Sequence, residues 1–562
     1  MKKILGLAVP AITAVIASLA TSVEAASLRP LGTYNPGLGE GASEITTYDA
    51  ATQRLFVTNA QSNTIDILNI SNPVTPTLFK QVDITPYGTD LNYLSFKNGL
   101  LAAALDGPSR QGAGSVTFFD AGGSFLRQLQ VGPRPDMLAF TPDGSKLVVA
   151  NEGTPSDDYT VDPEGSISIV NVLGGVNSAS VATADFKKFN TGHLDPSIRI
   201  FGPGASVAQD LEPENVAIAP DGKTAYISLQ ENNAIAVVDI DEADVISLFG
   251  AGFKDFGEAG NGLDASNRDD AVNIRTYDNL FGIYQPDAIA TYEANDETYI
   301  VTANEGDARV YPGDDTDTLD EGDAFNEEER VKDLELDPTV FPDGTNDDEV
   351  LGRLKVTTTL GDADGDGLYE ALYAFGGRSF SIYDSKGHQV FDSGDDFEQI
   401  IAQQAPKLFN VDIDAEDGVE TEREVDGRSD DKGPEPEGVS VGQIGDRIFA
   451  FISLERSNGI FTYDITDPTQ ANFVSFTPVA AGDISPEGNL FISAEESPTG
   501  QPLVILSNEL SGTTTLYEVT GLGPDTPTST EVSEPMSNAG LFILAAIGGI
   551  GLMRRRDWSS KR

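Results

Sequence analysis

Short apolar runs recur along the chain, and many of them are joined by turns built from a repeated phrase. Residues 135–140 form one such run, Pro142-Asp143-Gly144 follows it, and residues 147–150 form the next run. The phrase returns at residues 213–222, ahead of the run at 225–229. Two apolar runs around a Pro-Asp-Gly turn predict a β-hairpin. Because the hairpin repeats, the pattern indicates a β-propeller.

Weaker copies of the hairpin fill much of the remaining chain, at residues 55–69, 91–119, 286–306, 436–455 and, in compressed form, 486–495. A third apolar strand ending in Asp or Asn follows several hairpins, at residues 166–171, 234–239, 380–384 and 460–464. We therefore predict an all-β fold, a β-propeller of about seven or eight blades with YVTN/lactonase-like repeats and acidic loop insertions. A short helix is expected near residues 395–404. A β-sandwich with coincidental turns is the alternative, and the way in which the ring closes stays open.

Residues 1–25 have the features of a secretory signal peptide. Lys2 and Lys3 precede an apolar stretch, and Val23-Glu24-Ala25 offers a cleavage site of small residues. No cysteine follows, which excludes a lipoprotein anchor. A retained membrane helix is the alternative. The predicted exported domain is the propeller, at residues 26–520.

The C-terminal end has a second targeting pattern. A Gly/Pro/Thr/Ser linker and the motif Ser533-Glu534-Pro535 occupy residues 521–535, and residues 536–562 contain an apolar segment followed by Arg554-Arg555-Arg556. This order resembles the PEP-CTERM class of bacterial sorting signals, although Ser533 stands where that motif has its first proline. The resemblance implies a sorting protease and a place on the cell envelope, on the cell surface or outside a bacterium. If the tail is retained, its helix anchors the protein in the membrane.

The charge balance excludes some partners. The chain has 90 acidic and 35 basic residues, a net charge of −55, so binding to nucleic acid is not expected. Such acidity suits divalent cations or a saline exterior, and solubility in salt alone would also explain it. There is no cysteine, and the two histidines, His193 and His388, lie beside glycines in turns. A serine triad, a thiol or a zinc centre is therefore not indicated.

The propeller geometry places many acids at one end of its central channel. The first strand of a blade lies innermost and the second runs antiparallel to it, so the start of one and the end of the other share a face. We place Asp136, Glu214, Asp287, Glu437 and Glu487 at starts of first strands, and Glu152, Glu305, Glu455 and Glu495 at ends of second strands. Gathered carboxylates raise one another's pKa, and a calcium or magnesium ion relieves that repulsion.

From these positions we predict six metal ligands at the channel mouth: Asp136, Glu152, Glu214, Asp287, Glu305 and Glu437. Separate solvation of each acid is the alternative. Three arginines lie near these positions and are predicted to bind an anion, although they could instead neutralise the acids: Arg134, Arg309 and Arg456.

A sharper cation signal lies in one acidic loop. Asp362, Asp364, Asp366 and Glu370 stand at positions 1, 3, 5 and 9, with Gly367 at position 6. This spacing is typical of a calcium loop, but position 12 is Tyr373, so the loop is not an EF-hand. A plain acidic turn is the alternative. Two other acidic stretches, at residues 314–337 and 412–437, are expected to be solvated, mobile loops.

Several motifs together resemble the choice-of-anchor I family: Asn304-Glu305-Gly306-Asp307-Ala308-Arg309, Gly376-Gly377-Arg378, Gly433-Pro434-Glu435-Pro436-Glu437-Gly438 and Leu454-Glu455-Arg456. That family is similar to mesenchyme-specific cell-surface glycoproteins of biomineralising animals. The resemblance implies a surface or secreted propeller linked to calcium and mineral.

We expect a non-enzymatic binding or adhesion protein with calcium as its cofactor, and with surface polysaccharide, mineral or a protein as its ligand. The alternative is a calcium-dependent phosphoester hydrolase of alkaline-phosphatase or phytase type, at the acidic mouth. It requires Glu152, Glu214, Glu305 and Glu437 to approach one shared metal ion. A lactonase-like propeller is a more distant third.

Overall fold

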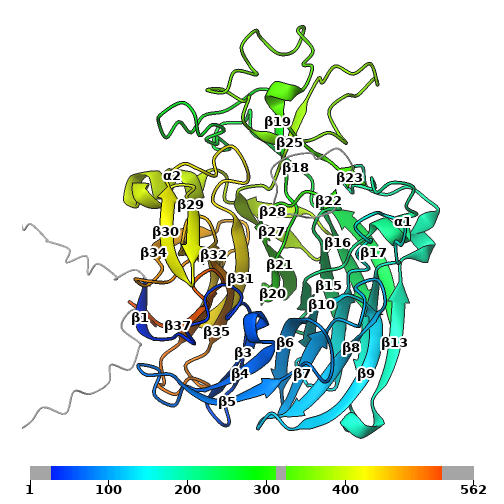
Figure 1. Ribbon diagram of the computed structural model, residues 1–562, viewed down its shortest axis with the longest axis vertical. Helices are drawn as coiled ribbons and strands as arrows, with labels where there is room; N and C mark the ends of the chain where they lie inside the picture. Colours follow the sequence, from blue (N-terminus) through cyan, green and yellow to red (C-terminus); the bar gives the residue numbers. More distant parts are fainter. Residues whose placement is uncertain (1–26, 312–323, 522–562) are drawn as a thin grey trace, which may run out of the picture. The chain divides into compact units, whose positions relative to one another are not determined.

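The computed structural model describes residues 27–311 and 324–521, and strands dominate it (Figure 1). Seven of its sheets have four strands each, and neighbouring strands in these sheets are antiparallel. This repeated four-stranded sheet is the blade of a β-propeller, so the predicted all-β propeller is confirmed. The signal peptide, the C-terminal linker and the apolar C-terminal segment predicted above lie outside the described residues.

The seven blades, each given from its inner to its outer strand, are as follows: β2–β5 (Thr46–Asp49, Arg54–Asn59, Thr64–Asn69, Thr77–Asp83); β6–β9 (Leu91–Lys97, Leu100–Leu105, Ala113–Asp120, Phe125–Pro133); β10–β13 (Pro135–Phe140, Lys146–Asn151, Ser166–Asn171, Ser180–Asp185); β14–β17 (Val216–Ile218, Thr224–Leu229, Ala234–Asp239, Asp244–Gly250); β20, β21, β27 and β28 (Ile289–Ala294, Glu297–Asn304, Ser379–Asp384, Gln389–Asp392); β31–β34 (Pro436–Ile444, Arg447–Leu454, Gly459–Asp464, Asn472–Pro478); and β35, β36, β37 and β1 (Pro486–Ile492, Leu503–Asn508, Thr513–Thr520, Ser27–Tyr34).

The inner strands form a closed ring. Successive inner strands contact each other from β2 through β6, β10, β14, β20 and β31 to β35, and β35 contacts β2 again. The ring closes because β1, the first strand of the described chain, pairs antiparallel with β37, with Leu28 opposite Val519. The propeller therefore has seven blades, and an N-terminal strand completes the last of them.

Burial explains why the second strands are continuous apolar runs. In β3, β11 and β15 every residue after the first is buried, whereas the outer strand β5 is exposed at six of its seven positions. The middle strands are apolar on both faces because each blade packs against a blade on either side. One such core joins Val148 and Ile167 of one blade to Val216 and Ile227 of the next.

Insertions add a further sheet to the blade of β20. Its strands β18 (Phe253–Asp255), β19 (Leu280–Ile283), β26 (Leu372–Phe375), β25 (Lys355–Thr357) and β24 (Glu328–Arg330) hydrogen-bond in that order, and only β19 and β26 are parallel. Most of them lie between β21 and β27, in the second-to-third connection of one blade. The buried Lys254 donates to the carbonyl oxygen of Gly377 at 2.9 Å and so fixes this sheet to the propeller.

Two of the acidic stretches are more ordered than the sequence predicted. Residues 412–424 form a hairpin of β29 (Asp412–Glu416) and β30 (Val419–Glu424), and Glu435 is only 1% exposed. Residues 325–333 contain β23 (Phe325–Asn326), which pairs with β22 (Val310–Tyr311), then β24 and a 3-10 turn. The expectation of solvated, mobile loops was wrong for Glu435 and for residues 325–333, where buried or half-buried acids pair with arginine and lysine side chains. The hairpin at residues 412–424 is ordered, but most of its side chains are exposed to solvent as expected.

The remaining elements are short helices. The predicted helix near residues 395–404 is α2 (Asp396–Gln404), and α1 is Val207–Asp210. The 3-10 turns are Ala60–Ser62, Val176–Ser178, Lys187–Asn190, Val331–Asp333 and Pro406–Leu408. Across residues 27–311 and 324–521, no helix is long and apolar enough to span a membrane.

Candidate functional site

The three inner strands that begin with proline all start with a β-bulge. In the blade of β10, Pro135 pairs with Asn151 and Leu138 pairs with Val149, so the inner strand accommodates one extra residue. The same shift occurs between Pro436 and Val439 and between Pro486 and Asn489. The residues before the three prolines have left-handed backbones, with φ of 43°, 49° and 59°: Arg134, Glu435 and Ser485. A bulge redirects the side chain beside it, and here that side chain belongs to the acid after the proline.

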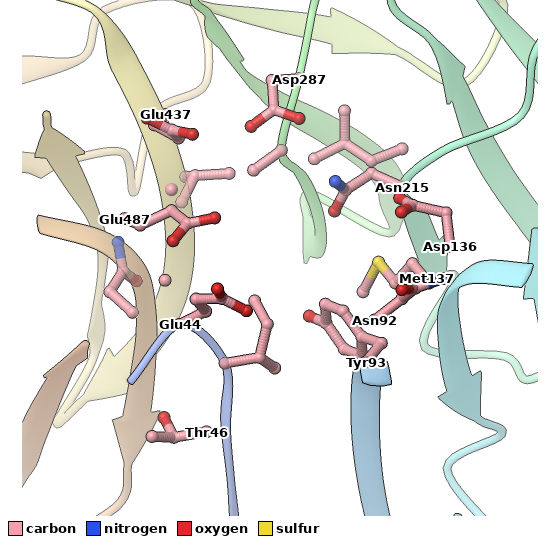
Figure 2. A pocket seen from close by; sticks show the side chains of 17 residues that line it. Glu44, Thr46, Asn92, Tyr93, Asp136, Met137, Asn215, Asp287, Glu437 and Glu487 are labelled. Atoms are coloured by element: carbon pink, nitrogen blue, oxygen red, sulfur yellow. The ribbon is translucent and has the colours of Figure 1, made fainter. Parts of the chain in front are cut away.

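These bulges face a cavity of about 240 Å³, which is lined by residues at the starts of all seven inner strands. Figure 2 shows the carboxylates directed into it: Glu44, Asp136, Asp287, Glu437 and Glu487. In the blade of β6 the corresponding place is taken by Asn92. The ring is tight enough to need glycine, because a Cβ at Gly438 would lie 2.2 Å from the backbone oxygen of Glu487. The repeated Pro-acid phrase therefore builds the wall of the central channel.

Three of the predicted metal ligands meet at one point of this wall. The carboxylate oxygens of Asp287, Glu305 and Glu437, here called the channel triad, lie within 4.8 Å of one another. Oε2 of Glu437 is buried and accepts no hydrogen bond from any described residue. Burial raises the pKa of Asp287 and of Glu437 well above the usual range, and repulsion from Glu305 adds to both shifts. A cation would remove this repulsion.

Glu305 differs from the other two members because donors already hold it. Its Oε1 accepts from Nζ of Lys432 at 2.5 Å, and its Oε2 accepts from Nε2 of Gln230 at 2.9 Å. The chain passes very close to this residue, since a Cβ at Gly376 would lie 2.0 Å from the backbone oxygen of Glu305. Gly376 also has φ of 79°, so glycine is required there for two reasons. This crossing places two of the sequence motifs next to each other at the channel mouth.

The other three predicted ligands, Glu152, Glu214 and Asp136, do not join the triad. Glu152 forms an ion pair with Nε of Arg134 at 2.7 Å, and accepts a 2.5 Å hydrogen bond from Thr154. Glu214 is buried beside Glu231; burial is the largest cause of its raised pKa, and the charge and hydrogen bond of Glu231 add to the shift. Asp136 lines the cavity, and burial raises its pKa to about 6 although Arg134 acts in the opposite direction.

The three arginines predicted to bind an anion are engaged with carboxylates. Arg309 is 2% exposed and pairs with Asp210 at 2.7 Å and with Glu212 at 3.3 Å. Arg456 lies 3.3 Å from Glu455, and Arg134 holds Glu152 as described above. The structure therefore favours neutralisation of the acids over capture of an anionic ligand.

Glu495 was placed wrongly at the end of a second strand. It is exposed and lies after β35, which is an inner strand, and the second strand of that blade is β36. The residue that follows β36 is Glu509, and it occupies the place that Glu495 was expected to fill. Burial and repulsion from Glu455 raise the pKa of Glu509 to about 7.

Sequence reasoning missed three residues of the site. Glu44 precedes β2 without a Pro-acid phrase, so nothing marked it as a channel residue. Lys432 and Glu435 were treated as parts of a solvated loop, although both belong to the charged mouth. A signal for Glu435 existed, because it stands directly before Pro436, as Arg134 stands before Pro135.

The acidic loop between β25 and β26 forms the second predicted group. Ligand oxygens of Asp362, Asp364, Asp366 and Glu370 lie within 4.8 Å of one another. Asp362 accepts from the backbone amides of Gly365 at 2.7 Å and Gly367 at 3.0 Å, which curls the loop around its first residue. The loop is mostly exposed and belongs to the inserted sheet.

Both histidines lie in turns at the surface. His193 and His388 are exposed, and Nδ1 of His388 lies 2.9 Å from Oδ2 of Asp384 four residues earlier. Neither histidine is among the residues that line the channel cavity. The described geometry therefore provides no histidine base at the site.

The channel wall and its motifs correspond to a known family. The model of the Choice-of-anchor I domain matches residues 44–468, from Glu44 through β33. The chain belongs to the choice-of-anchor I family. Residues of the channel triad all fall inside the matched range.

Two curated relatives support this choice-of-anchor I assignment. Gigasin-3a of Magallana gigas is 34% identical over 197 residues, which is 32% of this chain and 68% of that protein. The mesenchyme-specific cell surface glycoprotein of Strongylocentrotus purpuratus is 30% identical over 348 residues, which is 58% of this chain and 42% of that protein. The chain therefore spans less than half of the sea-urchin protein.

Two solved structures show distant likenesses to this choice-of-anchor I chain. Kuenenia stuttgartiensis hydrazine synthase has a TM-score of 0.44 at 12% identity, covering 86% of this chain and 97% of the other. Saccharomyces cerevisiae Sqt1 has a TM-score of 0.39 at 10% identity, covering 87% and 99%. At these scores the two likenesses carry no argument about the site.

Proposed function

We propose that this protein is a surface-associated or exported β-propeller that binds calcium through the carboxylates of its central channel. The observation that carries the proposal is the channel triad, where Asp287, Glu305 and Glu437 meet with ligand oxygens within 4.8 Å of one another. The sea-urchin relative is a cell surface glycoprotein by name, which supports the surface location. A role in binding or adhesion, to surface polysaccharide, mineral or a protein, is part of the proposal.

The donor set fits a hard divalent cation. The triad itself offers only carboxylate oxygens as ligands, and such sets suit calcium or magnesium. The buried oxygen of Glu437 that lacks a hydrogen bond has a place for a ligand bond, and the cavity has room for water to complete the shell. Calcium accepts six to eight oxygens in irregular geometry, so a wall of three carboxylates and water suits it better than magnesium.

A titration with calcium tests the proposal. The double variant Asp287→Asn with Glu437→Gln should lose calcium binding at the channel, with affinity falling at least 100-fold because two of three anionic ligands are gone. Isothermal calorimetry on the metal-free protein measures this. In the absence of calcium the same variant should unfold at a higher temperature, because the repulsion at the triad is removed.

The matched control carries the same change of charge at exposed acids, Glu242→Gln with Asp343→Asn. It should bind calcium like the original protein. Equal affinity of both double variants would refute a channel site. Absence of calcium binding by the original protein would refute the proposed function itself.

The loop at residues 362–370 is a second proposed calcium site, supported by its spacing and by its gathered oxygens. The change Asp364→Ala should reduce the rise in melting temperature that calcium produces, by a few degrees, because the loop loses one of four carboxylate ligands. Differential scanning fluorimetry with and without calcium measures the rise. Asp343→Ala, an exposed acid of the same insertion, is the control, and an unchanged calcium response in Asp364→Ala would contradict the site.

The hydrolase alternative receives less support from the geometry. It required Glu152, Glu214, Glu305 and Glu437 around one metal ion, but only Glu305 and Glu437 meet. Glu152 is held by Arg134 and Glu214 by Glu231. We therefore propose binding rather than hydrolysis. Phosphoester turnover that rises with calcium would reverse this preference.

A further inference from the structure

One cationic side chain already lies at the channel triad. Nζ of Lys432 is 2.5 Å from Oε1 of Glu305 and 3.6 Å from Oε2 of Glu435. With Gln230 on the other oxygen, Glu305 has both oxygens engaged by donors. In the described structure neither Asp287 nor Glu437 forms an ion pair, so the triad is neutralised from one side only.

We infer that Lys432 is a built-in counter-ion of the channel site, and that a divalent cation binds by displacing its ammonium from Glu305. The inference rests on the proposed function and adds how the site is regulated. An ammonium and a divalent cation on the same oxygen repel each other at short range, so Glu305 ligates the cation well through Oε1 only after the ammonium has left that oxygen. Binding is then an exchange of a tethered monovalent cation for a free divalent one.

The backbone around Lys432 is fixed, so its ammonium is delivered to a defined place. Arg378 donates to the carbonyl oxygens of Ser429 at 2.8 Å and of Asp431 at 2.7 Å, which both come shortly before Lys432 in the chain. Arg428 donates to Glu435 at 2.8 and 3.0 Å and closes the segment from the other end. The turn is therefore held, and rotations within the four-carbon side chain of Lys432 are enough to move its ammonium.

The displaced ammonium has a place to go. Glu435 is 3.6 Å from Nζ of Lys432 and already lies at the centre of a group of basic side chains. A rotation of the lysine side chain transfers the ammonium from Glu305 to Glu435 without exposing either carboxylate. Because the same ammonium screens the triad in the absence of metal, it lowers the repulsion there and at the same time weakens cation binding.

The experiment compares calcium affinity in two charge-removing variants. Lys432→Met should bind calcium at least about ten-fold more tightly, because a positive charge within a few ångströms of the ion is gone. Its metal-free form should melt at a lower temperature, because the triad loses its counter-ion. Arg456→Gln removes one positive charge from the same mouth without a contact to Glu305, and its affinity should change less than three-fold. Calorimetry gives the affinities and scanning fluorimetry gives the melting temperatures.

A second variant guards against a folding defect in Lys432→Met. Lys432→Gln keeps a hydrogen-bond donor for Glu305 without the charge, and it should show the same tighter binding. If both Lys432 variants bind calcium no more tightly than the original protein, the inference is wrong. If Arg456→Gln tightens binding as much as Lys432→Met, the general field and not the Lys432 contact is responsible, and the inference is again wrong. If only Asp287→Asn with Glu437→Gln loses calcium binding, the proposed calcium site stands even where the inference about Lys432 fails. If none of the proteins binds calcium, the proposed function fails as well.

Discussion

Replacing Arg378 with methionine is expected to lower the free energy of unfolding by about 3–5 kcal/mol. The guanidinium is 4% exposed, pairs with Glu398 at 2.7 Å, and donates to the carbonyl oxygens of Asp264, Ser429 and Asp431. Its removal leaves a buried carboxylate without its cation and three carbonyl groups without a donor. In the original protein this guanidinium joins the helix α2, the inserted segment and the turn before Glu435 in one hydrogen-bonded network. Unfolding in urea measures the loss.

The control for this change is an arginine in an exposed pair. Arg447 has a side chain that is 41% exposed and lies 2.7 Å from Asp464. Surface pairs of this kind contribute less than about 1 kcal/mol, so Arg447→Met should unfold close to the original midpoint. If Arg378→Met is as stable as Arg447→Met, the buried network does not hold these segments together.

Without calcium, the protein is expected to lose stability as the pH rises from about 4.5 to 7. Burial raises the pKa of Glu44 to about 7, and repulsion from Glu509 adds to it; the pKa of Glu509 is itself raised to about 7. Both carboxyls keep their protons in the folded protein over a range where the unfolded chain has lost them. Stability is therefore fully present below about pH 4.5 and declines until these groups ionise near pH 7. The expected loss is on the order of 3 kcal/mol.

Urea unfolding at pH 5 and pH 7.5, with a chelator present, measures this slope. The double variant Glu44→Gln with Glu509→Gln should show a much flatter dependence, because its two groups no longer titrate. Asp221→Asn, at an exposed turn, should keep the original slope. A variant that still loses as much stability as the original protein would place the titrating groups elsewhere. Calcium at saturating concentration should also flatten the slope of the original protein.

The blades were predictable because each carries its own local signals. The third strands at 166–171 and 234–239 agree with β12 and β16 to the residue, since an apolar run bounded by a turn and a final Asn or Asp defines both ends. The compressed copy at 486–495 was misread because the loop between β35 and β36 separates the two strands of its hairpin. The number of blades depended on β1, whose partner β37 is almost the whole domain away in sequence.

Residues of the channel could be predicted only in blades that contain the repeated Pro-acid phrase. The phrase pointed to Asp287 and Glu437, and strand ends pointed to Glu305, so all three members of the triad were among the six predicted ligands. Nothing in the sequence separated them from the other three. Glu44 could not, because its blade lacks the proline that marked the others. The pairing of acids with Arg134, Arg456 and Lys432 depends on side-chain directions and on a turn between blades. Neither of these features produces a repeated pattern in the sequence.

The closing strand pair also determines how the propeller would carry a load. Ser27 of β1 lies opposite Thr520 of β37, so the chain enters and leaves the domain at the same point of one blade. A tether attached to either end would apply its force to the same pair of strands, β1 and β37. Tension applied beyond Thr520 acts along β37, which is hydrogen-bonded to a strand on each side, and must slide against both. Tension applied before Ser27 acts on the outermost strand and can peel it away one hydrogen bond at a time. The propeller should therefore resist a pull on its C-terminal end better than the same pull on its N-terminal end.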